Sequence, residues 1–334
     1  MLTFTIRRLL LAIPTLLFIS LVIFLLLEAS PGDPLGDVPL TVPPEVKERM
    51  REALGLGSPW YVRYVLWLKQ FFWVEPLYWF DSVFGTQFSA GMQRIISFQS
   101  RSPVFDVIAQ RIPQTLTVVG FSYLVGVLIA LPIGILSAYK QYSWFDQLGT
   151  FVSMIGFSMP TFFTGVVLII IFGVKLQWFP SVYDTTLEVR DWDSFLAQVR
   201  QMVMPVTVLA LYNAAQISRF MRASMLDNLG QDYVRTARAK GMPEHRVILR
   251  HALRPAMLPV ISYLGPVFVS MITGSVVIDI YFSTGGIGKA FVDSALNRDY
   301  AVMMGVTILV GALTILFNLV VDILYAWIDP KIRY

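Results

Sequence analysis

The chain of 334 residues contains no cysteine and only two histidines. Disulfides and thiolate metal sites are therefore excluded, and little remains from which a zinc site could be built. Charge is also scarce, because Asp, Glu, Lys and Arg make up 14% of the residues while hydrophobic residues make up 56%. A mean hydropathy of +0.64 is too high for a soluble domain of this length. The composition indicates an integral membrane protein.

Catalytic signatures are missing as well. No acid, base and nucleophile are grouped as in an enzyme. The one run that could be read as a phosphate-binding loop, STGGIGKA from Ser283 to Ala290, has Ser283 in place of the first glycine and Ala290 in place of the magnesium-binding hydroxyl. We therefore expect that this chain does not hydrolyse ATP and binds no cofactor. A net charge of +4 could indicate nucleic acid, but the basic residues adjoin apolar segments, so no nucleic-acid partner is predicted.

Six apolar stretches are candidates for membrane-spanning helices, which need about 20 residues each. They are residues 9–27, 115–138, 148–174, 202–220, 257–281 and 301–327. A signal peptide is the rival interpretation of the first, but it exceeds the usual apolar length of about 7–15 residues and is followed by a poor cleavage site. Pro132 and Pro160 lie inside the second and third stretches and are expected to kink them. The predicted fold class is an all-α integral membrane protein with six transmembrane helices.

The distribution of positive charge predicts the orientation. The two ends and the pieces on their side of the membrane hold thirteen Lys or Arg, against five on the two short opposite pieces. The positive-inside rule therefore makes both termini cytoplasmic. The expected parts are the N-terminus with the first helix, a long external loop region with short helices, a core of five helices, and a cytoplasmic tail. Their bounds are 1–27, 28–113, 114–327 and 328–334.

Aromatic residues crowd the predicted external region between Trp60 and Phe80. Their rings are apolar, while their N–H and O–H groups favour water, so this segment is expected along the membrane surface with lipid as a partner. A nucleic-acid stacking platform would need interleaved positive charge, and Glu75 and Asp81 argue against it.

The longest basic loop, residues 219–255, joins the fourth and fifth predicted spans. Within it, Asp232 is expected to cap a short helix, Gly241 to end it in a left-handed conformation, and Pro243 to open a second short helix. In the second helix, basic and apolar residues fall on different faces, with Arg246, Arg250 and Arg254 on one and Val247, Ile248 and Ala252 on another. The loop therefore needs support from the membrane helices and leaves its other face to a partner.

The string YVRTARAKG in this loop resembles the EAA loop of ABC-transporter membrane subunits, in the version found in the dipeptide, oligopeptide and nickel importer branch. Arg235, Thr236 and Ala237 stand where that family has Glu-Ala-Ala, and Gly241 is the family's glycine. The segment closes on ALRP, residues 252–255, one residue later than the family's Ile-x-Leu-Pro. The resemblance extends over most of the chain. Its other supports are Arg7-Arg8, Pro31-Gly32-Asp33-Pro34 and Pro330, and it leaves out residues 73–99.

The resemblance implies a multi-pass permease subunit of an ATP-driven, binding-protein-dependent importer of dipeptides, oligopeptides or related small solutes, in the inner or plasma membrane of a bacterium or archaeon. The implied partners are a second homologous permease forming a heterodimer, two ATP-binding subunits that hold ATP and Mg, and an external solute-binding protein. The ATP-binding subunits are expected to contact Arg235, Thr236, Ala237, Arg238, Lys240, Gly241, Met242 and Pro243.

The residues by themselves leave a gradient-driven transporter or a channel open as alternatives. A gradient-driven transporter needs ionisable groups deep in its spans, whereas the predicted spans hold only Asp279 and Asp322, each close enough to a boundary to be solvated. No charged ring or carbonyl filter indicates a channel. Three polar residues of the fourth span either line a solute path or join helices by hydrogen bonds. These are Asn213, Gln216 and Ser218. His245 and His251 are expected at a surface or an interface.

Overall fold

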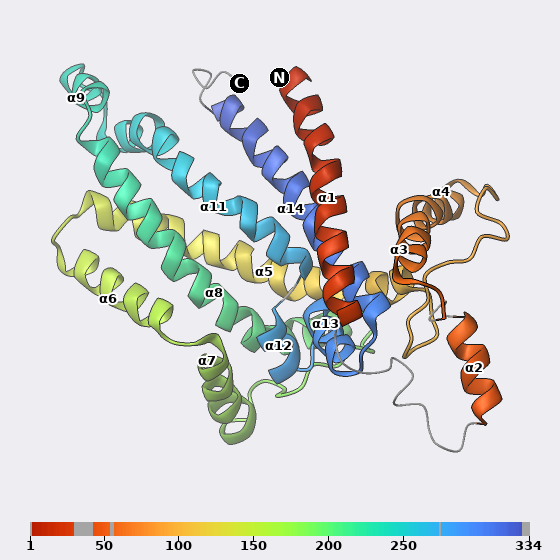
Figure 1. Cartoon of the computed structure of the whole chain (residues 1–334). Helices are drawn as coiled ribbons and strands as arrows, with labels where there is room; N and C mark the ends of the chain where they lie inside the picture. The colour runs from red at the N-terminus through yellow and green to blue at the C-terminus, as the bar shows by residue number, and fades with distance from the viewer. Residues whose placement is uncertain (1, 30–42, 54–56, 274, 329–334) are drawn as a thin grey trace. The chain divides into compact units, whose positions relative to one another are not determined.

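The computed structural model of this chain describes residues 2–29, 43–53, 57–273 and 275–328 (Figure 1). The predicted tail and the Pro31–Pro34 segment lie outside these residues. Within them, regular structure is helical, apart from an isolated bridge between Ile96 and Pro103. The helices are α1 Leu2–Ala29, α2 Pro44–Ala53, α3 Trp60–Lys69, η1 Gln70–Val74, α4 Glu75–Phe84, α5 Val104–Tyr139, α6 Trp144–Ser158, α7 Thr161–Leu168, η2 Ile169–Lys175, α8 Trp192–Leu229, α9 Asp232–Ala239, α10 Glu244–Arg246, η3 Val247–Ala252, α11 Leu253–Thr273, α12 Val276–Tyr281, α13 Ile287–Leu296 and α14 Tyr300–Ile328, where η denotes a π-helix.

Four described helices are long and apolar enough to cross a membrane, namely α1, α5, α8 and α14. The pair formed by α6 and α7 with η2 passes the same test together and would be a fifth crossing if it is one span. The prediction of an all-helical, multi-pass membrane protein is confirmed. Two of the predicted spans are each divided into separate helices.

The stretch 148–174, predicted as one kinked span, is broken by 98° between α6 and α7. Met159 and Pro160 both have extended backbone conformations, with ψ of 125° and 136°. A proline disfavours helical geometry in the residue before it, which explains why α6 ends at Ser158. Pro132, by contrast, lies inside the continuous helix α5. The predicted span 257–281 is also wrong as a single helix, because Ser275 caps a separate helix, α12, by accepting from the backbone N–H of Ile278.

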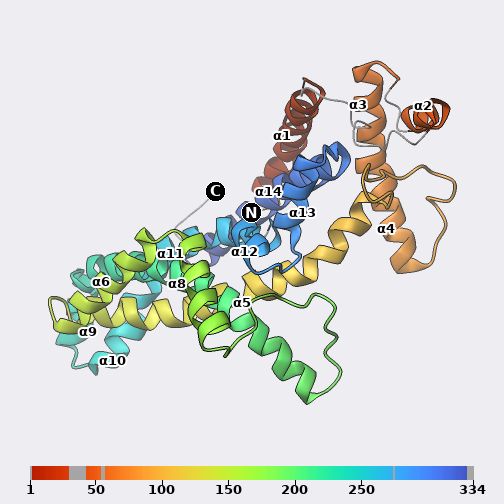
Figure 2. The same ribbon diagram turned by 90° about the horizontal axis from the view of Figure 1, so that it is seen from below.

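The chain forms two compact units, and the larger comprises residues 1–6, 113–288 and 313–334. Its central element is α8, against which α6, α7 and α11 pack (Figure 2). Small residues allow the close approach of α5: a Cβ on Gly134 would lie 2.6 Å from the Cβ of Met221. Ile217 and Met221 are fully buried in the resulting core.

The second unit comprises residues 7–112 and 289–312. Its core is aromatic: the Trp67 ring stacks 5.0 Å from Phe71, and Phe71 lies 5.1 Å from Phe105 between ring centroids. Buried acids fix the segment after α4. Glu75 accepts from Arg94 at 2.8 Å, and Asp299 accepts from the side chain of Ser97 and from the backbone N–H of Phe98 at 3.1 Å.

Candidate functional site

The predicted basic loop forms the short helix α9 at the end of α8 (Figure 1). Gly241 has a φ of +72°, which confirms the predicted left-handed turn. The predicted cap is wrong: Gln231 holds the cap position without a side-chain hydrogen bond, and Asp232 is already the first helical residue. Pro243, with ψ of 139°, precedes the next helix rather than opening it.

The inner face of α9 is apolar. Val234 is fully buried and Ala237 is 5% exposed, in a cluster with Val247 and Ala252, and Met242 packs against the same cluster. Because Val234 and Ala237 are three residues apart, they share one face of the helix. The apolar face packs α9 against the ends of α8 and α11, and the Tyr233 hydroxyl adds a hydrogen bond to Asn228 of α8 at 2.5 Å.

The outer face of α9 and the turn that follows it carry the remaining predicted contact residues. The exposed members of the set are Arg235, Thr236, Arg238, Lys240, Gly241 and Pro243. Arg238 donates to Glu244 at 2.7 Å across the bend at Gly241, and this bond lowers the pKa of the Glu244 carboxyl. The outer face is thus a cationic surface held at a fixed bend, while Ala237 and Met242 support it from beneath.

The second predicted short helix is not separate from the span that follows. The chain runs from α10 through η3 into α11 with helical backbone at both junctions, Val247 and Leu253. The predicted faces are confirmed: Arg246 and Arg250 are exposed, whereas Val247 and Ala252 are fully buried. His245 is exposed, while the Nε2 atom of His251 is buried. The loop is therefore joined stiffly to α11.

A cavity of about 480 Å³ lies in the same unit, beside the break between α6 and α7. Tyr123 of α5, Tyr212 and Asn213 of α8 and Ser270 of α11 line it. Asn213 is only 3% exposed, so its amide is directed to buried surroundings. Residues 157–162 also line the cavity, and within them Met159 and Pro160 leave the helical conformation between α6 and α7.

Two of the three polar residues predicted in the fourth span join helices by hydrogen bonds, and the third lines the cavity. Asn213 lines the cavity. Gln216 accepts from the Tyr263 hydroxyl at 2.8 Å, and Ser218 shares a hydrogen bond of 3.0 Å with Ser153, so both join α8 to neighbouring helices. The sequence analysis missed that Tyr123 and Tyr212 line the cavity and that the break between α6 and α7 lies beside it. The run Ser-Met-Pro-Thr at 158–161 was a possible signal, because a polar, proline-containing run can interrupt a span.

Asp279 is not solvated as predicted but 3% exposed, and it accepts from the Thr284 hydroxyl. The glycine run that follows wraps this carboxylate: a Cβ on Gly286 would lie 2.6 Å from it, and one on Gly288 would lie 2.8 Å from it. These glycines are therefore explained by close approach to a buried acid. Asp322, the other acid of the spans, is partly exposed. Across the described ranges, no three His, Asp or Glu converge as metal ligands.

The chain combines helices that cross a membrane with a polar cavity among them and a cationic loop at their end. These features together define a membrane transport subunit. Two family models match: the N-terminal part of the binding-protein-dependent transport system membrane component over residues 1–119, and the inner membrane component of that system over residues 130–334. The chain belongs to this family of binding-protein-dependent transport system inner membrane components.

Close relatives include three oligopeptide transport system permease proteins, and each alignment covers 100% of both chains. Identity is 39% to AppB of Bacillus subtilis, 40% to OppB of Haemophilus influenzae and 39% to OppB of Escherichia coli. Among solved structures, the fold is similar to a chain of the MetNI methionine ABC transporter in an inward-facing conformation. That similarity has a TM-score of 0.55 at 16% identity and covers 68% of this chain and 99% of that chain.

Family membership decides between the alternatives that the residues left open. The chain is a permease subunit of an ABC importer, and the gradient-driven transporter and the channel are set aside. It is not an enzyme, because ATP hydrolysis in this family belongs to separate subunits. The prediction from the string YVRTARAKG is thereby confirmed.

Proposed function

We propose that this chain forms half of the translocation pathway for oligopeptides or chemically related small solutes, and that a second, homologous permease subunit supplies the other half. The observation that carries this proposal is the full-length identity of 39–40% to permeases named for oligopeptide transport. The cavity has suitable chemistry, since the hydroxyls of Tyr123, Tyr212 and Ser270 and the amide of Asn213 can exchange hydrogen bonds with a peptide backbone of any sequence.

The outer face of α9 is proposed to dock on the ATP-binding subunits, which hold ATP and Mg. Arg235, Arg238 and Lys240 would approach acidic groups of the partner, while Gly241 keeps the backbone close to its surface. The loop can move the pathway only if it binds two conformational states of the ATP-binding subunits with different free energies. Because η3 continues into α11, a displacement of the loop would reach Ser270 at the cavity.

In the membrane, we propose six crossings with both termini and α9 in the cytoplasm, and residues 28–113 outside with an external solute-binding protein. The excess of Lys and Arg on the proposed inner side supports this orientation.

The absence of cysteine allows a direct test of the orientation. Lys240→Cys would be the only thiol of the chain, and a membrane-impermeant maleimide should label it in inside-out vesicles but not in right-side-out vesicles. The opposite pattern would overturn the orientation.

The coupling role is tested by Gly241→Val in the transporter reconstituted with the subunits that co-purify with it. A β-branched residue at a φ of +72° costs about 1–2 kcal/mol, so the bend should shift. We expect peptide uptake to fall at least tenfold while ATP hydrolysis continues. Gly230→Val is the matched control, because Gly230 lies at the other end of α9 in an ordinary helical conformation with open space around it. Equal uptake by the two variants would contradict the proposal.

The pathway role is tested by Asn213→Leu, which keeps the size of the side chain but removes its hydrogen-bonding groups from the cavity. Peptide uptake should fall without loss of assembly or of basal ATP hydrolysis. Ser218→Ala is the control, because Ser218 bonds to Ser153 and does not line the cavity. A larger loss of uptake in the control would show that helix packing, and not solute contact, accounts for the polar residues of α8.

A further inference from the structure

One side of α8, next to the cavity at Asn213, carries a polar stripe. Tyr212, Gln216 and Arg219 are spaced four and three residues apart, so they lie on the same side of the helix. None of the three is buried, whereas residues 213–215, 217 and 218 are. A glutamine and an arginine are unfavourable against hydrocarbon, so the stripe indicates a side of α8 that faces the solute pathway.

The Arg219 side chain is directed back toward the cavity. Its guanidinium carbon lies 5.4 Å from the ring centroid of Phe157. Phe157 lines the cavity and stacks on Tyr212, with 6.2 Å between the ring centroids. An arginine at the end of a membrane helix ordinarily extends into the water beyond that end. Here the side chain instead follows the lean of helical side chains toward the N-terminus of their helix, which for α8 is the side of the cavity.

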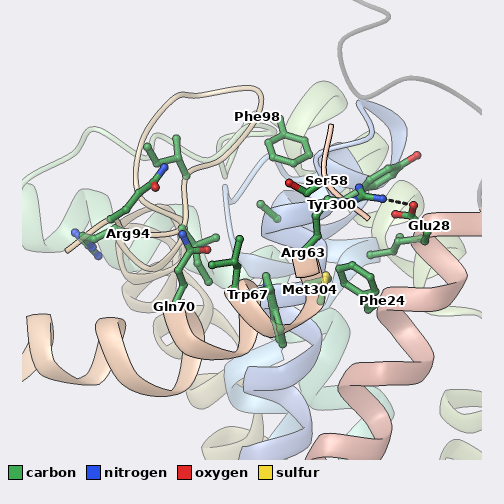
Figure 3. A pocket seen from close by; sticks show the side chains of 16 residues that line it. Phe24, Glu28, Ser58, Arg63, Trp67, Gln70, Arg94, Phe98, Tyr300 and Met304 are labelled. Carbon is green, nitrogen blue, oxygen red and sulfur yellow. Dashed lines mark hydrogen bonds and ion pairs between the residues drawn. The ribbon is translucent and has the colours of Figure 1, made fainter. Parts of the chain in front are cut away.

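Arg219 has no carboxylate partner among the residues that the structure describes, and its recorded contact is the Phe157 ring. Two other arginines show the usual arrangement. Arg222, three residues further along α8, donates to Asp146 at 2.6 and 2.7 Å. In the second unit, Arg63 is paired with Glu28 where both line a cavity of about 360 Å³ (Figure 3). The N–H donors of Arg219 are therefore available to an acceptor from outside the chain.

The cavity itself offers no charge to a solute. Among the described residues that line it, none is Asp, Glu, Lys, Arg or His. A peptide in transit carries a carboxylate at its C-terminus, and removal of an ion from water without a partner costs far more than removal of a hydrogen-bonded neutral group. A guanidinium is suited to this need, because it binds a carboxylate through two parallel hydrogen bonds.

The spacing along α8 fits a short peptide. Tyr212 and Arg219 are seven residues apart, which is a rise of about 10 Å in an α-helix. An extended peptide of three residues has about the same length. Gln216 lies between them, and because its oxygen accepts from the Tyr263 hydroxyl at 2.8 Å, its NH₂ group is left as a donor to a peptide carbonyl. A tripeptide can thus bond to the cavity through its backbone while its carboxylate reaches Arg219.

We propose that Arg219 binds the C-terminal carboxylate of a peptide as the peptide leaves the cavity toward the α9 end of α8. The guanidinium then exchanges its contact with the Phe157 ring for charge-assisted hydrogen bonds. The pathway accordingly favours solutes with a free carboxyl end. This inference rests on the proposed function of the cavity in peptide translocation.

The first test compares the uptake of trialanine and of trialanine amide into proteoliposomes. These contain the transporter with its co-purifying subunits and its external solute-binding protein, either unmodified or with Arg219→Gln. We expect the variant to lower the maximal rate of trialanine uptake at least tenfold and to change KM little, because KM reflects capture by the external protein. The amide has no carboxylate, so its uptake should change less than twofold. An equal loss for both solutes would overturn the proposal.

A second variant separates the charge of the side chain from its shape. Because the chain has no cysteine, Arg219→Cys would hold its only thiol. The reagent 2-aminoethyl methanethiosulfonate forms a mixed disulfide with this thiol, releases methanesulfinate and leaves a cation in place. Propyl methanethiosulfonate leaves a neutral group of similar size. Trialanine uptake should recover with the cationic reagent only, and recovery with both would overturn the proposal. The unmodified transporter, treated in the same way, reveals any effect on thiols of the other subunits.

Lys140→Gln is the matched control for the loss of one positive charge, because Lys140 is exposed in the turn between α5 and α6. Its uptake of trialanine should stay within twofold of the unmodified transporter, and basal ATP hydrolysis should be unchanged in both glutamine variants if they assemble. A tenfold loss of uptake in Lys140→Gln would overturn the specific role of Arg219.

The same measurements separate this inference from the proposed function. If the unmodified transporter took up neither solute, the proposed function would fail and this inference with it. If trialanine entered at the same rate with Arg219→Gln, only the role of Arg219 would be overturned.

Discussion

The loop around α9 and the segment that follows α4 are both irregular, yet they are held in opposite ways. In the α9 loop the charges are outside and the interior is built from small apolar residues such as Val234 and Ala237. The segment after α4 is held by buried acids of α4 itself: Glu75 is 3% exposed and Asp81 is 9% exposed, and each accepts several hydrogen bonds from that segment.

The two ways of holding a segment, apolar packing and hydrogen bonds to buried acids, suit different functions. Apolar packing has no preferred direction, so it can anchor a helix without using the charged groups of the outer face, such as Lys240. Bonds to buried acids are directional and consume those groups, so they fix a segment in one conformation. The α9 loop is thus built to be contacted, and the segment after α4 is built to keep its shape.

The largest effect should come from breaking the buried ion pair with Arg94→Met. The Glu75 carboxylate would lose the guanidinium 2.8 Å away and remain buried and unpaired. We expect a loss of about 3–5 kcal/mol in the free energy of unfolding, measured by denaturant titration in detergent. Arg190→Met is the control, because its pair with Glu188 is exposed on both sides and should contribute little. A similar loss in both variants would contradict the contrast between buried and exposed pairs.

A smaller effect is expected from Val247→Ala in the α9 loop. Val247 is fully buried in the apolar cluster, so deletion of two methyl groups should cost about 2 kcal/mol. Leu249→Ala, two residues further on and 58% exposed, should change the unfolding free energy by less than about 0.5 kcal/mol. If Leu249→Ala proved the more damaging, the inner and outer faces of this loop would have been assigned in reverse.

The smallest effect concerns pH and Asp81. Burial raises the pKa of this carboxyl, but hydrogen bonds from Ser89, Thr86 and the backbone N–H of Phe88 outweigh it and lower the pKa to about 2. The unfolded value is about 3.9. Because the folded pKa is the lower one, the stabilisation is present above about pH 4 and is lost as pH falls toward 2.

The measurement for Asp81 is limited proteolysis of the segment after α4 between pH 5 and 2. Asp81→Asn should be cleaved at a rate that changes less over this range than in the unmodified chain. Asp232→Asn is the control in the α9 loop, where the carboxyl is 97% exposed. If the cleavage rate changed equally with pH in the unmodified chain and in Asp81→Asn, the hydrogen-bonded carboxylate would be excluded as the source of the pH response.

Patterns that repeat along one helix could be predicted from the sequence. The spacing of Arg246 and Arg250 against Val247 and Ala252 predicted the two faces correctly, because helical periodicity is local. The left-handed turn at Gly241 was predictable for the same reason, since the conformational preference belongs to the residue itself.

Features that depend on tertiary neighbours could not be predicted. Pro132 and Pro160 looked equivalent in the sequence, yet α5 continues past the first and the chain breaks at the second. Near Pro132, Gly134 brings α5 close to Met221, and this packing holds the helix together. Likewise, the burial of Asp279 depends on Thr284 and a folded-back glycine run, and the cavity at Asn213 depends on tyrosines from two helices.

The π-helix η3 sets the rotation of α11 about its own axis. A π-helical turn contains an additional residue, and each residue of an α-helix advances by about 100°. With this offset in place, Ala256 and Val260 of α11 face the core, and they are 0% and 2% exposed. Deletion of one residue from η3 would turn α11 by about 100° relative to the loop. In this chain the angular setting of a membrane helix is therefore determined by the length of a segment in the loop before it.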